Sequence, residues 1–178
     1  MACILPFEGK SPKIAADVFV APTAAVVGDV EIGEGSSIWF GASVRGDFQP
    51  IRIGKYSNIQ DNTTIHVMGD HGLTIGDEVI IGHNCVIHSN KIGSHSLIMM
   101  GTILLGYTEI GENVIIGPGS LIPQGRKIPS NSLVLGEPAQ LIRSLRDDEI
   151  EALHASALNY HEIAQKYQAE FDKLAQQK

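Results

Sequence analysis

The sequence predicts an all-β solenoid built from short parallel strands, followed by one α-helix packed alongside it. Aliphatic residues recur at every sixth position through most of the chain, and the pattern changes to a helical one near the C-terminus. Glycine is frequent, with 19 in 178 residues, whereas aromatic residues make up only 6%. Small residues suit tightly turned repeated units that leave little room for bulky rings.

The six-residue period defines the strands. Six is a multiple of the two-residue period of a strand, so all the aliphatic side chains can point to one interior. A single unit cannot bury its apolar residue alone, and successive units must therefore coil and stack. The aliphatic positions are Ile14, Val20, Val26, Ile32, Ile38, Val44, Ile53, Ile59, Ile65, Ile75, Ile81, Ile87, Ile92, Ile98, Leu104, Ile110, Ile116, Ile122, Ile128 and Val134.

The repeat is interrupted in a regular way. Grouped in threes, the aliphatic positions form successive coils, and the six-residue spacing fails between residues 44 and 53, 65 and 75, and 87 and 92. Each interruption follows the third position of a coil, so all three fall at one corner, called the irregular corner below. We expect a functional site beside this corner.

The C-terminal segment differs in kind. The hexads stop after Gly136-Glu137-Pro138, and from Asp147 apolar residues alternate at spacings of three and four, as on one face of a helix. The sequence therefore predicts a repeat domain over residues 1–138 and a linker with an α-helix over 139–178. His154 and His161 lie off the apolar stripe and are expected on a solvated face.

Composition excludes several classes of partner. A net charge of −7 and a pI near 5.4 argue against binding to nucleic acid or to an anionic membrane surface. No apolar run is long enough for a transmembrane helix, and no secretory signal is visible at the start, so we expect a cytoplasmic protein. Cys3 and Cys85 do not form a disulfide framework, and Cys85 is expected to be a buried thiol.

Three histidines indicate a metal site. His66 and His88 each follow a third-position aliphatic residue directly, one coil apart, and Arg45 extends this column by one coil. Stacked strands lie about 4.8 Å apart, which allows two imidazoles to share a metal. His83 lies on the preceding face, so a neighbouring subunit could present it as the third ligand. A threefold trimer would then contain three equal sites.

The hexads over about residues 12–137 resemble the hexapeptide-repeat family, which implies a three-sided, left-handed parallel β-helix. A closer resemblance, to the γ-class carbonic anhydrases, extends through the C-terminal helix. It implies reversible hydration of carbon dioxide to bicarbonate by a homotrimer. It also implies that the three histidines bind zinc, or iron or cobalt in its place. The residues that carry this resemblance are Arg45-Gly46-Asp47, Gln60, His66, Gly82-His83 and His88.

The same resemblance implies roles for other residues. Arg45 and Asp47 would form an ion pair across the subunit boundary, and Gln60 would hydrogen-bond the metal-bound water or bicarbonate. Tyr160 resembles an aromatic residue that some relatives place near the metal, although its position in the apolar stripe fits simple packing equally well. A divalent metal on three neutral imidazoles lowers the pKa of its bound water towards about 7, which provides the hydroxide that attacks carbon dioxide.

Other interpretations remain open. The loop at residues 67–74 is short and lacks the glutamate that active relatives often carry, which favours slow turnover or a non-catalytic metal-binding or assembly subunit. His71 or Asp70 could relay protons there. Residues 136–139 resemble the segment that closes the β-helix in acyltransferases, which use an acyl-CoA donor and one histidine as general base. Hydrolysis of another carbonyl compound, such as a thioester, is a further alternative.

Overall fold

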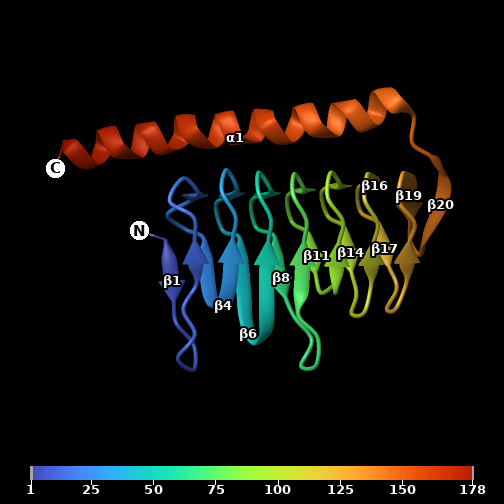
Figure 1. Cartoon of the computed structure of the whole chain (residues 1–178), viewed down its shortest axis with the longest axis horizontal. Helices are drawn as coiled ribbons and strands as arrows, with labels where there is room; N and C mark the ends of the chain where they lie inside the picture. The colour runs from blue at the N-terminus through green and yellow to red at the C-terminus, as the bar shows by residue number, and fades with distance from the viewer. Residues whose placement is uncertain (1, 178) are drawn as a thin grey trace.

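The computed structural model describes residues 2–177 and forms a parallel β-helix with one long α-helix beside it (Figure 1). The coils stack in a row from the N-terminal strands (blue) to the last coil (yellow). The helix α1 (Asp147–Gln176) begins beyond the last coil and runs back along the row. The chain therefore ends near the first coils, as expected for a helix that packs along the whole solenoid.

The strands are short, and only those that pass around a corner are longer. Their bounds are β1 (Cys3–Leu5), β2 (Lys13–Ile14), β3 (Phe19–Val20), β4 (Ala25–Ile32), β5 (Ser37–Ile38), β6 (Ser43–Ile53), β7 (Asn58–Ile59), β8 (Thr64–His66), β9 (Leu73–Ile75), β10 (Ile80–Ile81), β11 (Val86–Ile87), β12 (Lys91–Ile92), β13 (Leu97–Ile98), β14 (Ile103–Leu104), β15 (Glu109–Ile110), β16 (Val114–Ile116), β17 (Leu121–Ile122), β18 (Lys127–Ile128), β19 (Ser132–Gly136) and β20 (Ala139–Ser144).

The strand register confirms the three aliphatic columns. Ile32 pairs with Ile53 on the first face of the prism. On the second face Ile38 pairs with Ile59, and on the third Val44 pairs with Ile65. Every strand pair between coils is parallel, and the aliphatic side chains of the inner coils are almost fully buried. The hexads therefore fill the interior of the prism, as predicted.

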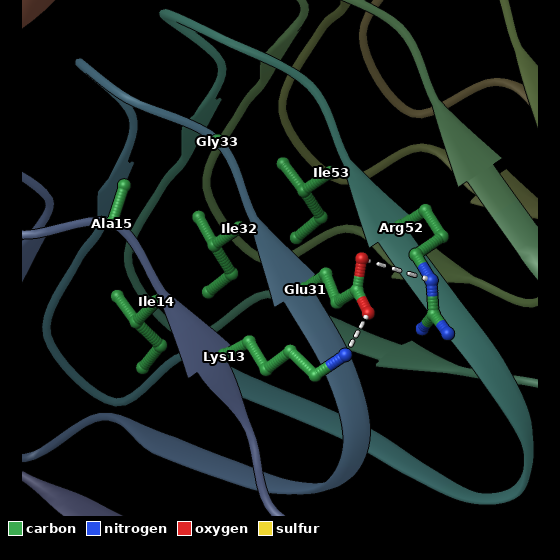
Figure 2. A pocket seen from close by; sticks show the side chains of 8 residues that line it. All are labelled: Lys13, Ile14, Ala15, Glu31, Ile32, Gly33, Arg52 and Ile53. Carbon is green, nitrogen blue, oxygen red and sulfur yellow. Dashed lines mark hydrogen bonds and ion pairs between the residues drawn. The ribbon is translucent and has the colours of Figure 1, made fainter.

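Side chains alternate inward and outward along each face. A shallow pocket of about 450 Å³ on the first face shows this alternation (Figure 2). Ile14, Ile32 and Ile53 point to the interior, while the residues before them form an outer ladder of charges. In this ladder Lys13 donates to Glu31 at 2.9 Å, and Arg52 lies 3.5 Å from the same carboxylate. Such exposed ion pairs contribute little to stability.

The irregular corner joins the first and third faces. Strands β4 and β6 continue around it without a break, so the two faces form one twelve-stranded sheet. The second face is a separate eight-stranded sheet, which begins at β3. The loop at residues 67–72, between β8 and β9, leaves the prism at this same corner. The structure thus places the irregular spacing where the sequence predicts it.

The helix packs lengthwise on the second face, next to β3, β5 and β7. An aromatic cluster joins the two: Phe19 lies 5.4 Å from Trp39, and Trp39 lies 5.2 Å from Tyr167 of α1, measured between ring centroids. No helix within residues 2–177 has the length and apolar character to cross a lipid bilayer. The most buried helix residues are Leu153, Ala157 and Ala164.

Two features of the C-terminal part differ from the sequence-based expectation. Residues 139–144, which the sequence assigned to a linker, form β20, which pairs antiparallel with β19 and closes the last coil. The expectation of a solvated face is wrong for His161, whose Nδ1 hydrogen-bonds the Gly35 carbonyl at 2.9 Å. His154 remains more than half exposed, yet it contacts Glu78 of the β-helix. Because the helix covers the edge of the second face, residues outside its apolar stripe also contact the turns that lead into this face.

Both cysteines are free thiols. Cys3 is exposed, whereas Cys85 is buried in the interior of the prism. Burial raises the pKa of the Cys85 thiol. Cys85 is therefore the buried, unreactive thiol that the sequence predicts.

Candidate metal centre

A column of polar residues lies beside the irregular corner, within β6, at the end of β8 and directly after β11. Arg45 pairs with His66 in the strand register, and His88 follows β11 one coil further on. Each residue follows a buried aliphatic one, so its side chain points away from the interior. The side chain of His66 is 18% exposed and is partly covered by Phe48, whose ring centroid lies 5.6 Å away. Arg45, His66 and His88 are called the site column below.

The two histidines of the site column have the geometry of a ligand pair. His66 Nδ1 lies 3.3 Å from His88 Nε2. Two nitrogens that bind one tetrahedral metal at about 2.0–2.1 Å are separated by roughly 3.3–3.4 Å. Burial, and then the proximity of His66, lowers the pKa of His88. This shift favours the neutral imidazole, which is the form that metal binding requires.

Asp47 orients the first of these imidazoles. Its Oδ1 lies 2.8 Å from His66 Nε2, and its other carboxylate oxygen pairs with Arg45. Burial of Asp47 acts to raise its pKa, but the hydrogen bonds from His66 and Arg45 outweigh burial and lower it. The ionised carboxylate only accepts hydrogen bonds, so His66 carries its proton on Nε2. The lone pair on Nδ1 then faces His88.

The pairing of Arg45 with Asp47 is local. The two residues form their ion pair within one chain and two positions apart. The pair across a subunit boundary that the resemblance implies stays a prediction. Within the chain, Arg45 compensates the carboxylate that orients His66, which links the first residue of the site column to the second.

The remaining predicted residues form a second group on another part of the prism. Gln60, His83 and Tyr160 line a cavity of about 260 Å³ between the second face and α1. Gln60 is 5% exposed, whereas the side chain of His83 is 45% exposed and has its Nδ1 3.0 Å from Asp61 Oδ2. Asp61 was not predicted as a site residue, although it directly follows Gln60 on the coil next to that of His83.

Within one chain the three predicted metal ligands are divided between two places. His66 and His88 meet in the site column, and His83 lies with Gln60 at the other cavity. Within residues 2–177, only one trio of His, Cys, Asp or Glu side chains has its ligand atoms within 4.8 Å of one another, and it contains none of these three histidines. Each chain thus presents two imidazoles in the site column and a single imidazole at the other cavity.

The loop at the irregular corner holds the two proposed proton-relay residues. Asp70 accepts a hydrogen bond from the Tyr107 hydroxyl at 3.0 Å and lies 3.0 Å from His71 Nδ1. All three side chains are on the surface. The hydrogen bond from His71, supported by a weaker effect of the Tyr107 hydroxyl, lowers the pKa of Asp70, and burial only partly opposes this shift. A relay through this loop stays a prediction.

Comparison with known proteins places these features in a family. The family model described as "Bacterial transferase hexapeptide (six repeats)" matches residues 91–124. A carbonic anhydrase of Geobacillus kaustophilus is 45% identical over 93% of this chain and 91% of its own length. The mitochondrial γ carbonic anhydrase 2 of Arabidopsis thaliana is 41% identical over 94% of this chain, which spans 63% of that relative.

A solved structure from Bacillus cereus, described as an acetyltransferase, has the same fold. It superimposes with a TM-score of 0.92 at 41% identity and covers 94% of this chain and 98% of the other. The extent of this match includes the β-helix and the C-terminal helix. Together with the identity to the Geobacillus protein over nearly its whole length, it shows that the chain belongs to the γ-class carbonic anhydrase-like family of hexapeptide-repeat proteins.

Proposed function

We propose that this protein catalyses the reversible hydration of carbon dioxide to bicarbonate at metal centres shared between the subunits of a homotrimer. The observation that carries the proposal is the 3.3 Å separation of His66 Nδ1 and His88 Nε2, with Asp47 holding the first ring. The relatives named as carbonic anhydrases support the reaction. Two free cysteines suit a reducing compartment, and we propose the cytoplasm.

The donor set indicates the class of metal. His66 and His88 of one subunit and His83 of the next would provide three neutral imidazoles, which is a zinc-type set with an open fourth position. Iron or cobalt can take its place, because imidazole suits these metals as well. When bound, the metal lowers the pKa of a coordinated water towards neutrality and so supplies a nucleophile.

The protein's own residues would prepare this centre. Asp47 keeps His66 in the tautomer that directs Nδ1 to the metal. Gln60 stands beside His83, where its amide can donate to one oxygen of bicarbonate and accept from another donor. Met99 and Met100 give the same cavity apolar walls that suit carbon dioxide. Tyr160 closes the cavity from α1.

The surface between the two groups supports a trimer. Val86 of β11 pairs with Ile103 of β14 on the third face, and both side chains point outward with exposed fractions of 44% and 37%. Leu105, which follows β14 in line with the site column, is 39% exposed. These apolar residues flank His88, so a neighbouring copy that covered them would also bring its own surface to the site column.

Complementation between inactive chains tests the shared centre. We expect the His66→Ala and His83→Ala proteins each to lose stoichiometric metal and carbon dioxide hydration in stopped-flow assays. In a mixed trimer, one interface joins the intact His66 and His88 of one chain to the intact His83 of the other. Mixed trimers should therefore recover about a third of the wild-type sites. A monomeric wild type, or no recovery in verified mixed trimers, would contradict the proposal.

One observation favours a second function. The Bacillus cereus neighbour is described as an acetyltransferase, which would need one histidine as general base and an acyl-CoA donor. Metal-free protein that acetylates an amine or hydroxyl would establish this alternative. Metal-loaded trimers without hydration above background would instead indicate a metal-binding or assembly subunit, and turnover of a thioester would indicate another hydrolase.

A further inference from the structure

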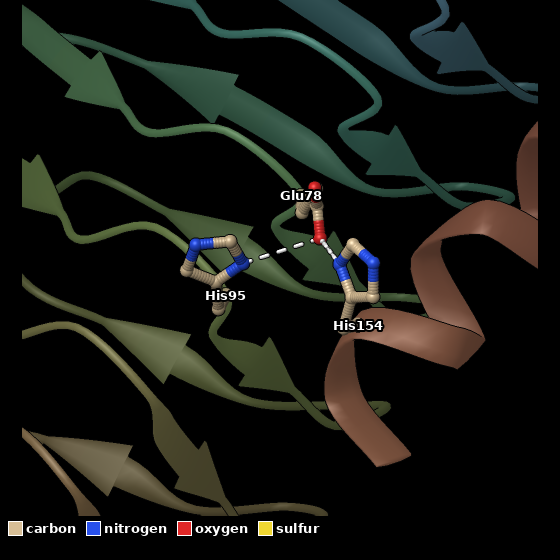
Figure 3. A group of neighbouring side chains, drawn as sticks. All are labelled: Glu78, His95 and His154. Atoms are coloured by element: carbon tan, nitrogen blue, oxygen red, sulfur yellow. Dashed lines mark hydrogen bonds and ion pairs between the residues drawn. The ribbon is translucent and has the colours of Figure 1, made fainter. Parts of the chain in front are cut away.

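A second cluster of metal-binding side chains lies away from the site column, where α1 crosses a corner of the β-helix. Glu78 and His95 occupy equivalent turn positions of successive coils and share a left-handed backbone, each with φ of +56°. The chain stacks these turns directly, because the His95 amide donates to the Asp77 carbonyl at 2.9 Å. His154 approaches from α1 (Figure 3).

Both imidazoles point to one carboxylate oxygen. Glu78 Oε2 lies 3.2 Å from His95 Nδ1 and also bonds His154 Nδ1, as the dashed lines of Figure 3 show. The ligand atoms of the three side chains all lie within 4.8 Å of one another. The Glu78 side chain is only 14% exposed, whereas His95 and His154 are 40% and 57% exposed. The cluster is therefore anchored at its carboxylate and open to solvent on the histidine side.

Two imidazoles and one carboxylate form a donor set that zinc uses with an open fourth position. Binding requires the neutral form of each imidazole, with the proton on the ring nitrogen that does not bind. The outer nitrogens of His95 and His154 can carry that proton because neither ring is enclosed. Two unrelated ion pairs could form at different oxygens. Here the rings of His95 and His154, which come from different elements, meet at the same oxygen of Glu78.

A further carboxylate lines the pocket beside this cluster. Glu151 lies three residues before His154 on α1, and the two line a cavity of about 380 Å³ together with His95 and Asn113. Glutamate and histidine at this spacing lie on one face of a helix. Helical metal sites use the same Glu-x-x-His arrangement to direct two ligands to one ion.

We propose that Glu78, His95 and His154 form a second metal site, of the zinc type, that fastens α1 to the corner of the β-helix. The aromatic cluster holds the C-terminal half of α1 through Tyr167, whereas this site acts on the N-terminal half. Metal bound here would restrain the segment of α1 that leads to Tyr160 at the cavity. The site is independent of the proposed function, since it shares no residue with that centre.

Zinc is the probe for this site. In a His66→Ala/His88→Ala background, which removes the first centre, we expect one zinc per chain by metal analysis and calorimetry. His154→Ala should abolish this binding, and Glu78→Gln should weaken it at least tenfold. His161→Ala is the matched control, because His161 is on the same helix, contacts the Gly35 carbonyl and lies outside the cluster. Its zinc binding should be unchanged.

A second measurement uses the chain with its first centre intact. Cobalt absorption should show two classes of site in the wild type and one in His154→Ala, and zinc should slow amide exchange in residues 148–158 only when His154 is present. If the proposed function fails, the cobalt site that depends on His66 should be missing, whereas the cobalt site that depends on His154 should remain. A folded double-alanine chain that binds no zinc, or zinc binding that His154→Ala leaves intact, would overturn the proposal.

Discussion

Asp47→Asn tests how the site column is prepared for metal. Asp47 bonds both His66 and Arg45, and its side chain is only 12% exposed. The substitution removes the charge that fixes the His66 tautomer, and it leaves the Arg45 guanidinium uncompensated beside the proposed metal ligands. Loss of such a partner typically costs 10–100-fold in metal affinity. We expect the dissociation constant for zinc to rise by that factor, equivalent to about 1.4–2.7 kcal/mol.

The assay is competition for zinc with a coloured chelator, in a His154→Ala background that removes the second proposed site. Asp29→Asn is the matched control. Asp29 forms a comparable ion pair with Arg52 at 2.7 Å on a neighbouring strand, and its ion-pair partners are Lys10 and Arg52 rather than a histidine. The zinc affinity of the Asp29→Asn protein should differ from that of the unsubstituted protein by less than about twofold. An Asp47→Asn protein that retains wild-type affinity, while His66→Ala loses zinc, would refute the orienting role of Asp47.

Two further predictions concern stability. Ile81→Ala, at a fully buried position, should lower the free energy of unfolding by about 2–5 kcal/mol in urea titrations. Ile14→Ala, at a partly exposed position, should lower the free energy of unfolding clearly less. Equal losses for the two variants would contradict the burial of the aliphatic positions in one shared interior. Hydrogen bonds from Arg143 and from the Arg146 amide lower the pKa of Glu149 to about 2. Its contribution is therefore present above the unfolded pKa of about 4.3 and is lost as pH falls towards 2. Glu149→Gln should remove this acid-dependent part of helix stability by circular dichroism, and an unchanged acid profile would contradict it.

The repeat was predictable from the sequence because one physical rule governs every coil. Each aliphatic position must face the same interior, so the spacing alone sets the register that joins Ile38 to Ile59 and Val44 to Ile65. The irregular corner was predictable for the same reason, as the place where that spacing fails. The site column followed, because His66 and His88 hold equivalent positions in neighbouring coils.

Contacts between distant elements were not predictable in this way. The cluster of Glu78, His95 and His154 depends on how far α1 rises along the prism and which corner it crosses. A helical stripe shows which side faces the β-helix but not which turns lie under each residue. Residues 139–144 were predicted to be a linker because they lack the six-residue repeat. Their antiparallel pairing with β19 depends on the open edge of the last coil, which the repeat does not specify.

The irregular corner has a consequence for how such proteins diversify. Ile53 and Ile75 remain aligned although 22 residues separate them, while Ile92 and Ile110 are aligned across 18. The extra residues leave the prism as a loop, and the cost of closing a loop grows only slowly with its length. Segments of different length can therefore be grafted beside His66 without displacing the interior. Exchange of this loop would alter the surroundings of His66 while the interior of the prism stays constant.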